Sequence, residues 1–124
     1  MTPVLLALGV ALAGGVGAAC RMLLDGIVKQ RARLPLPLGT MLVNVTGSFL
    51  LGAVTGLAAE LGPWALILGT GMLGGYTTFS TASYETVRLA QEGRWRAALV
   101  NGFGMLLLAL VAAWLGLSLA ALLP

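Results

Sequence analysis

Four long stretches without a charged side chain limit what this chain of 124 residues can fold into. They run over residues 1–20, 35–59, 61–84 and 97–124. Each can cross a hydrocarbon layer of about 30 Å, which takes roughly 20 helical residues. Charged residues make up 9% of the chain, against about a quarter in a soluble domain. The sequence therefore predicts an all-α membrane protein.

The four stretches leave almost nothing for a soluble domain, so we expect a single transmembrane domain over 1–124. Gly62 and Pro63 mark the second connection between helices, and Gly93 marks the third. The predicted helices span about 3–28, 37–59, 63–91 and 96–122.

The basic residues are divided unevenly between the two sides of the membrane. With four spans, the first and third connections share one side, and six basic residues flank them: Lys29, Arg31, Arg33, Arg88, Arg94 and Arg96. The other side holds the amino terminus and Glu60. Because Lys and Arg favour the cytoplasmic side, we expect one orientation in the inner membrane, with both termini outside. The same bias accounts for the net charge of +3 without nucleic acid as a partner.

The second predicted helix carries a polar stripe. Thr40, Asn44 and Ser48 recur every four residues and so share one face. A carboxamide in hydrocarbon needs a partner outside its own helix, so Asn44 either lines a pathway or joins two helices. Arg21, within the first helix, has two readings as well. It either reaches the interface, paired with Asp25 one turn on, or lines a water-filled entry.

The third predicted helix contains a segment that forms helix poorly. Glycine, hydroxyl and aromatic residues fill positions 74–78, and broken backbone at membrane depth survives only against protein, water or an ion. Carbonyls freed there can coordinate a hard cation such as Na⁺. Phe79, Ser80 and Thr81 follow. Aromatic ring edges carry partial positive charge and hydroxyls donate hydrogen bonds, so this group suits an anion.

Three segments resemble the small bacterial fluoride channels of the Fluc, or CrcB, family. They are GGVGAACR at 14–21, GTMLVNVTGSFLLG at 39–52 and GGYTTFST at 74–81. Their order and spacing cover essentially the whole chain. The resemblance implies an antiparallel dimer of four-helix subunits, with the third helix broken at mid-membrane. Two pores along the subunit interface would let fluoride leave the cytosol passively.

The resemblance also implies roles for single residues. Asn44 would be a pore-lining amide donor and Arg21 would sit in the vestibule. Phe79 would turn its ring edge to the ion. The polar track would be continued by Ser80 and Thr81, with Thr40 and Ser48 on the stripe of Asn44. The carbonyls of Gly74 and Thr77 from both subunits would hold a structural Na⁺ that is not transported.

The chain departs from the family pattern along one wall of the expected pore. Ala82 stands where the family has a second phenylalanine, and Asn101 stands where it typically has a tyrosine. Met105 and Ala109 replace serines. We therefore expect this half of the pore to lack polar and aromatic groups. Together with the one-sided charges, the departures favour a homologous second subunit as partner over a second copy of this chain.

Other functions are less compatible with the sequence. A structural or assembly subunit with no conducting pore of its own remains open because of Ala82, Met105 and Ala109. A small multidrug-type exporter depends on a glutamate in its first helix, and this chain has none there. The chain has no His, no paired carboxylates and no nucleophile with a base, so we expect no enzyme.

Overall fold

The computed structural model describes residues 1–32 and 36–123, so Arg33 of the basic set lies outside the described residues. Within these ranges the chain is helical, with short connections and no strand. The α-helices and the two π-helical segments, η1 and η2, are α1 (Pro3–Arg31), α2 (Leu38–Gly56), α3 (Ala58–Leu61), α4 (Pro63–Leu66), η1 (Ile67–Leu73), α5 (Gly74–Tyr76), α6 (Ser80–Gln91), α7 (Trp95–Leu99), η2 (Val100–Gly104) and α8 (Met105–Ala120).

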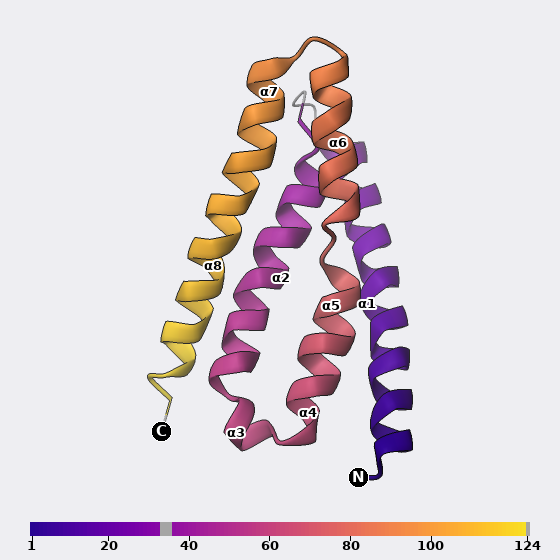
Figure 1. Cartoon of the computed structure of the whole chain (residues 1–124), viewed down its shortest axis with the longest axis vertical. Helices are drawn as coiled ribbons and strands as arrows, with labels where there is room; N and C mark the ends of the chain where they lie inside the picture. Colours follow the sequence, from indigo (N-terminus) through magenta and orange to yellow (C-terminus); the bar gives the residue numbers. More distant parts are fainter. Residues whose placement is uncertain (33–35, 124) are drawn as a thin grey trace.

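The helices form four columns along the long axis of the molecule (Figure 1). Two columns are single helices, α1 and α2. A third combines α4, η1, α5 and α6, and the fourth runs without a break from α7 through η2 to α8. Both termini lie at the same end, beside α3 and α4, while the connection from α6 to α7 lies at the other (Figure 1).

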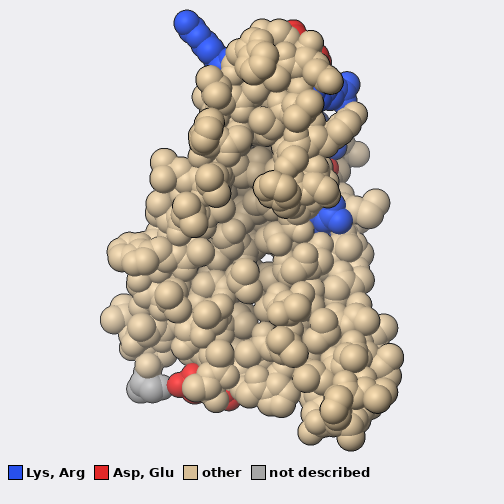
Figure 2. All heavy atoms as spheres, in the orientation of Figure 1, with Lys and Arg blue, Asp and Glu red and all other residues tan. Residues whose placement is uncertain are grey.

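Three of the columns are long and apolar enough to cross a membrane. They are Pro3–Arg31, Leu38–Gly56 and Trp95–Ala120, found among the described residues. The chain is therefore an all-α integral membrane protein. On the face in Figure 2, Lys and Arg lie in the upper half, and Asp and Glu atoms appear both in the upper half and at the lower end.

The observed ends differ from the expected ones by a few residues. α1 begins at a cap, since Thr2 Oγ1 accepts the Leu5 N–H at 3.2 Å, and it continues to Arg31 instead of ending near 28. α2 ends at Gly56, and residues up to Leu61 form the separate turn α3. Gly62, with φ of 59°, then redirects the chain into Pro63, a backbone conformation that favours glycine.

Glycines allow α2 and α8 to pack with their backbones in contact. A methyl group on Gly52 would overlap the Ala113 carbonyl oxygen, and one on Gly116 would overlap the Phe49 carbonyl oxygen. Small residues that let backbones approach are the usual way in which membrane helices associate.

Glycines also allow α1 to pack against the third column with their backbones in contact. A methyl group on Gly17 would overlap the Met72 carbonyl oxygen, and one on Gly75 would overlap the Gly14 carbonyl oxygen. This packing brings the first motif of the chain against the third, and it places Arg21 beside α5.

The third column is broken roughly halfway along its length (Figure 1). α5 ends at Tyr76, Thr77 is extended with φ −77° and ψ 159°, and α6 begins at Ser80. The third predicted helix, 63–91, is thus interrupted as expected, but in the later part of the segment 74–78 and not at its glycines. Gly74 and Gly75 stay helical, because their helix packs closely on α1, and the chain leaves the helix only at residues 77–79.

Candidate functional site

Asn44 on α2 holds the break open. Its Nδ2 donates to the Thr78 carbonyl at 2.8 Å, and its Oδ1 accepts the Thr78 N–H at 2.8 Å. In a continuous helix that N–H would donate to the carbonyl of Gly74. The side chain of Asn44 therefore replaces a helical hydrogen bond, and the Gly74 carbonyl loses its usual donor.

Thr78 repeats this exchange one turn further on. Its Oγ1 accepts the Thr81 N–H at 3.1 Å and lies 3.4 Å from Ser80 Oγ. In a continuous helix the Thr81 N–H would donate to Thr77. The carbonyls of Gly74 and Thr77, the two expected to hold a cation, are thus among those whose helical donors have been redirected.

A cavity of about 560 Å³ lies beside the break, between α2, α6 and the η2–α8 column. Four expected site residues line it: Asn44, Ser48, Thr77 and Phe79. Phe79 is 87% exposed, so its ring also faces outward from this subunit. Ser80 is exposed too, and Thr81 is half-buried.

One wall of the cavity is more polar than the sequence led us to expect. Ala82, Met105 and Ala109 lie on it as anticipated, but so does Asn101, which is fully buried. Asn101 Nδ2 donates to Thr86 Oγ1 at 2.8 Å. The Thr86 hydroxyl in turn donates to the Ala82 carbonyl at 2.8 Å.

Ser83 and Thr86 also line the cavity, and the sequence analysis did not select them. The signal that could have found Thr86 is its place on α6, four residues after Ala82 and therefore on the same face.

Asn44 also approaches the apolar part of this wall. Its Nδ2 lies 3.1 Å from Met105 Sδ. A thioether is a weak acceptor, so this amide hydrogen can be redirected to a better acceptor at little cost.

Thr40 and Arg21, like Gly74, Ser80 and Thr81, lie outside the cavity lining. Thr40 is buried and hydrogen-bonds to Glu85 Oε1 on α6. Arg21 reaches across from α1, with its Nε 3.4 Å from the Gly75 carbonyl.

The pairing of Arg21 with Asp25 that the sequence suggested is wrong. Among the described residues, the ion pair of Asp25 is with Lys29, 3.0 Å away and one turn further along α1. Close packing of α1 on α5 directs Arg21 toward a backbone carbonyl near the break instead.

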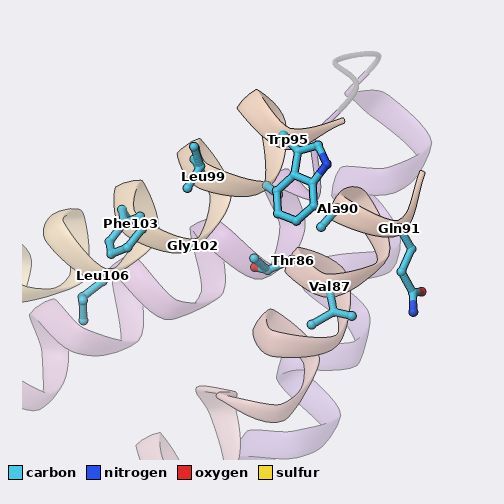
Figure 3. Close-up of a pocket in the computed structure, with 10 residues that line it drawn as sticks. Thr86, Val87, Ala90, Gln91, Trp95, Leu99, Gly102, Phe103 and Leu106 are labelled. Atoms are coloured by element: carbon cyan, nitrogen blue, oxygen red, sulfur yellow. The ribbon is translucent and has the colours of Figure 1, made fainter. Parts of the chain in front are cut away.

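A second cavity, of about 650 Å³, lies between α6 and the α7–η2–α8 column (Figure 3). Trp95, Leu99 and Phe103 form one side, and Val87 and Ala90 form the other. It shares Thr86 with the first cavity, and its lining is almost entirely apolar. The described residues contain no cluster of three or more His, Cys, Asp or Glu side chains that could hold a metal. A cation at the break would therefore depend on backbone oxygens.

Comparison with known proteins places the chain among membrane proteins of one family. A sequence model described as CrcB-like protein, Camphor Resistance (CrcB), matches residues 8–117. The chain is 60% identical over 125 residues to Fluoride-specific ion channel FluC 1 of Leifsonia xyli subsp. xyli, covering 98% of this chain and 90% of that protein.

Two further relatives show similar coverage. Fluoride-specific ion channel FluC 2 of Mycolicibacterium paratuberculosis is 48% identical over 122 residues, 98% of this chain and 99% of that protein. Fluoride-specific ion channel FluC of Solibacter usitatus is 43% identical over 115 residues, 90% and 94% of the two chains. These matches confirm the resemblance seen in the three motifs, and the chain belongs to the CrcB-like family.

Proposed function

We propose that this chain is a subunit of a fluoride-specific ion channel that lowers cytoplasmic fluoride by passive export across the cell membrane. Relatives that share nearly its whole length are named as fluoride-specific channels, and membership of their family confirms that the chain is not an enzyme. The observation that carries the proposal is the pair of hydrogen bonds between the Asn44 side chain and the backbone N–H and carbonyl of Thr78. It opens the helix beside a cavity in which donors and an aromatic ring edge meet.

The cavity offers fluoride several hydrogen-bond donors that come from different side chains. The hydroxyls of Ser48 and Ser83 lie in its lining, and the amide hydrogen of Asn44 near Met105 is only weakly engaged. Phe79 contributes the partial positive charge of its ring edge. Ser80 and Thr81 follow at the start of α6, and Arg21 attracts anions from the basic end of the molecule. The ion passes without meeting a full cation in the cavity lining.

A structural Na⁺ fits the break. The carbonyls of Gly74 and Thr77 have lost their helical donors to Asn44 and Thr78, and hard cations take oxygen ligands of this kind. Two carbonyls are too few for Na⁺, so a second subunit supplies the remainder. When bound, the ion supplies a fixed positive charge that holds the two breaks together, and it is not transported.

The assembly is an antiparallel dimer in which each chain crosses the membrane four times. The third column makes its crossing in two halves, and both termini face outward because of the one-sided basic charges. The ring of Phe79 is exposed in the single subunit, and in the dimer the partner subunit would bury it. A homologous partner with the opposite charge bias explains the asymmetry best, and the numbered names FluC 1 and FluC 2 of the relatives support such pairs. A second copy of the chain is the alternative.

One observation favours a second candidate function. Ala82, Met105 and Ala109 make part of the cavity wall apolar. A subunit whose own pore is blocked there would serve only to complete its partner.

Fluoride resistance in cells tests the proposal. A bacterium without fluoride export is given this chain, alone or together with a homologous chain, and its cytoplasmic fluoride is measured after exposure. We expect cytoplasmic fluoride to fall in at least one of the two strains. Unchanged fluoride in both, with the chain present in the membrane, would contradict the function.

A further inference from the structure

The carboxamide oxygen of Asn101 is buried without a partner in the part of the chain that the structure describes. The residue is 0% exposed and lies in the lining of the 560 Å³ cavity. Its amide nitrogen is engaged by Thr86 Oγ1. The oxygen is therefore the end of the side chain that is left for a ligand.

The local backbone supports a role other than packing. Asn101 lies in η2, a π-helical segment within the otherwise regular fourth column. Single π-helical turns cost backbone geometry and occur frequently at functional sites. The preceding residue, Val100, faces outward with 54% of its surface exposed, whereas Asn101 faces inward and is fully buried.

An unpartnered acceptor in a dry cavity is costly, and an electron-rich oxygen repels a bare anion. A water molecule resolves both problems, because it donates one hydrogen to the oxygen and presents the other to the cavity. The cavity as a whole is far larger than one water, but no surface of Asn101 is exposed, so the carboxamide must shift slightly toward the cavity to receive the water. The hydroxyls of Ser48, Thr78 and Ser83 share the lining.

We infer that Asn101 binds a fixed water molecule through Oδ1, and that this water supplies the hydrogen-bond donor with which the η2–α8 wall contacts the permeating ion. Asn101 is thus a positioning residue, and its role rests on the proposed function. The wall that has lost polar residues at Met105 and Ala109 regains a donor through solvent.

Asn101→Leu separates this role from a packing role. Leucine branches at the same atom as asparagine, removes the unpartnered oxygen and leaves the bond from Thr86 to Ala82 in place. We expect fluoride efflux from liposomes to fall about tenfold, as the loss of one hydrogen bond to the ion implies, while the melting temperature does not fall. Val100→Leu, in the same π-helical turn but outside the cavity lining, is the matched control, with efflux unchanged.

Two results would overturn the inference. One is unchanged efflux from Asn101→Leu, and the other is a parallel fall of efflux and melting temperature, which a structural role predicts. A crystal structure of the unaltered assembly provides a readout that does not depend on conduction. It should show an ordered water about 2.8 Å from Asn101 Oδ1, and a dry oxygen would refute the inference. Absence of fluoride efflux from the unaltered chain, alone and with a homologous partner, would instead refute the proposed function.

Discussion

The side-chain amide of Asn44 forms two hydrogen bonds with the backbone of a single residue, Thr78, one with its N–H and one with its carbonyl, and each is 2.8 Å long. The side chain of Asn44, on α2, thereby accepts the hydrogen bond that the Gly74 carbonyl would accept if the third column were a continuous helix. This relationship ties the shape of the break to one side chain.

Asn44→Leu should destabilise the fold and abolish fluoride efflux. It leaves the N–H and carbonyl of Thr78 without their partner in an apolar setting, at a cost of about 2 kcal/mol for the two bonds. Thermal unfolding in detergent, with efflux measured in parallel, checks this. Thr55→Val is the matched control on the same helix. Among residues 1–32 and 36–123, Thr55 Oγ1 bonds only to the Leu51 carbonyl one turn back, and the residue is exposed. Equal stability of Asn44→Leu and the unaltered chain would contradict the role of Asn44.

Gly116→Ala should prevent α2 and α8 from packing. The added methyl group would overlap the Phe49 carbonyl oxygen, and backbone atoms cannot move aside as a flexible side chain can. We expect a loss of about 3 kcal/mol or more, comparable to overpacking a core, seen as poor yield and a lower melting temperature. Gly15→Ala is the control, since nothing lies within 4 Å of its added methyl group, and it should gain up to about 1 kcal/mol from helix propensity. A stable Gly116→Ala protein would show that the two helices are not in close contact.

Removal of Na⁺ should lower the melting temperature of the purified channel, with K⁺ at the same ionic strength as the control. Thr78→Val should weaken this dependence on Na⁺. Without the Thr78 hydroxyl, the Thr81 N–H can return to the Thr77 carbonyl and compete with the ion. Melting curves over a range of Na⁺ concentrations measure both effects. A melting temperature that is the same in Na⁺ and K⁺ would argue against a structural Na⁺.

Labelling of single cysteines tests the orientation of the chain. In a Cys20→Ser background, we expect Leu123→Cys to react with a membrane-impermeant thiol reagent added to intact cells, and Gln91→Cys to be protected. Both residues are exposed and lie at opposite ends of the molecule (Figure 1). Labelling of Gln91→Cys at the level of Leu123→Cys would mean that the chain inserts in both directions, and it would remove the reason for a homologous partner.

The fold could be predicted from the sequence further than the site could. Long charge-free stretches are sufficient to indicate membrane helices, since few other structures satisfy backbone groups in hydrocarbon. The break was expected within residues 74–78, partly because glycine forms helix poorly. Tertiary packing overrode that propensity. Gly75 lies on Gly14, where only a residue without a Cβ fits, and the chain leaves the helix where Asn44 captures Thr78.

Local sequence could not place the partners of the site residues. Asp25 forms its ion pair with Lys29 and not with Arg21, because the packing of α1 on α5 directs Arg21 toward the Gly75 carbonyl. The burial of Asn101 depends on a π-helical turn, and the sequence of residues 100–104 contains no pattern that predicts one. Such features arise from contacts between columns and not from spacing along the chain.

Fluoride efflux from liposomes tests the central claim most directly. The purified chain is reconstituted alone and with a homologous chain, and efflux of fluoride is compared with efflux of chloride under the same gradient. The account predicts rapid fluoride efflux with little chloride efflux in at least one preparation. Chloride efflux as fast as that of fluoride, or no efflux from either preparation of folded protein, would contradict it.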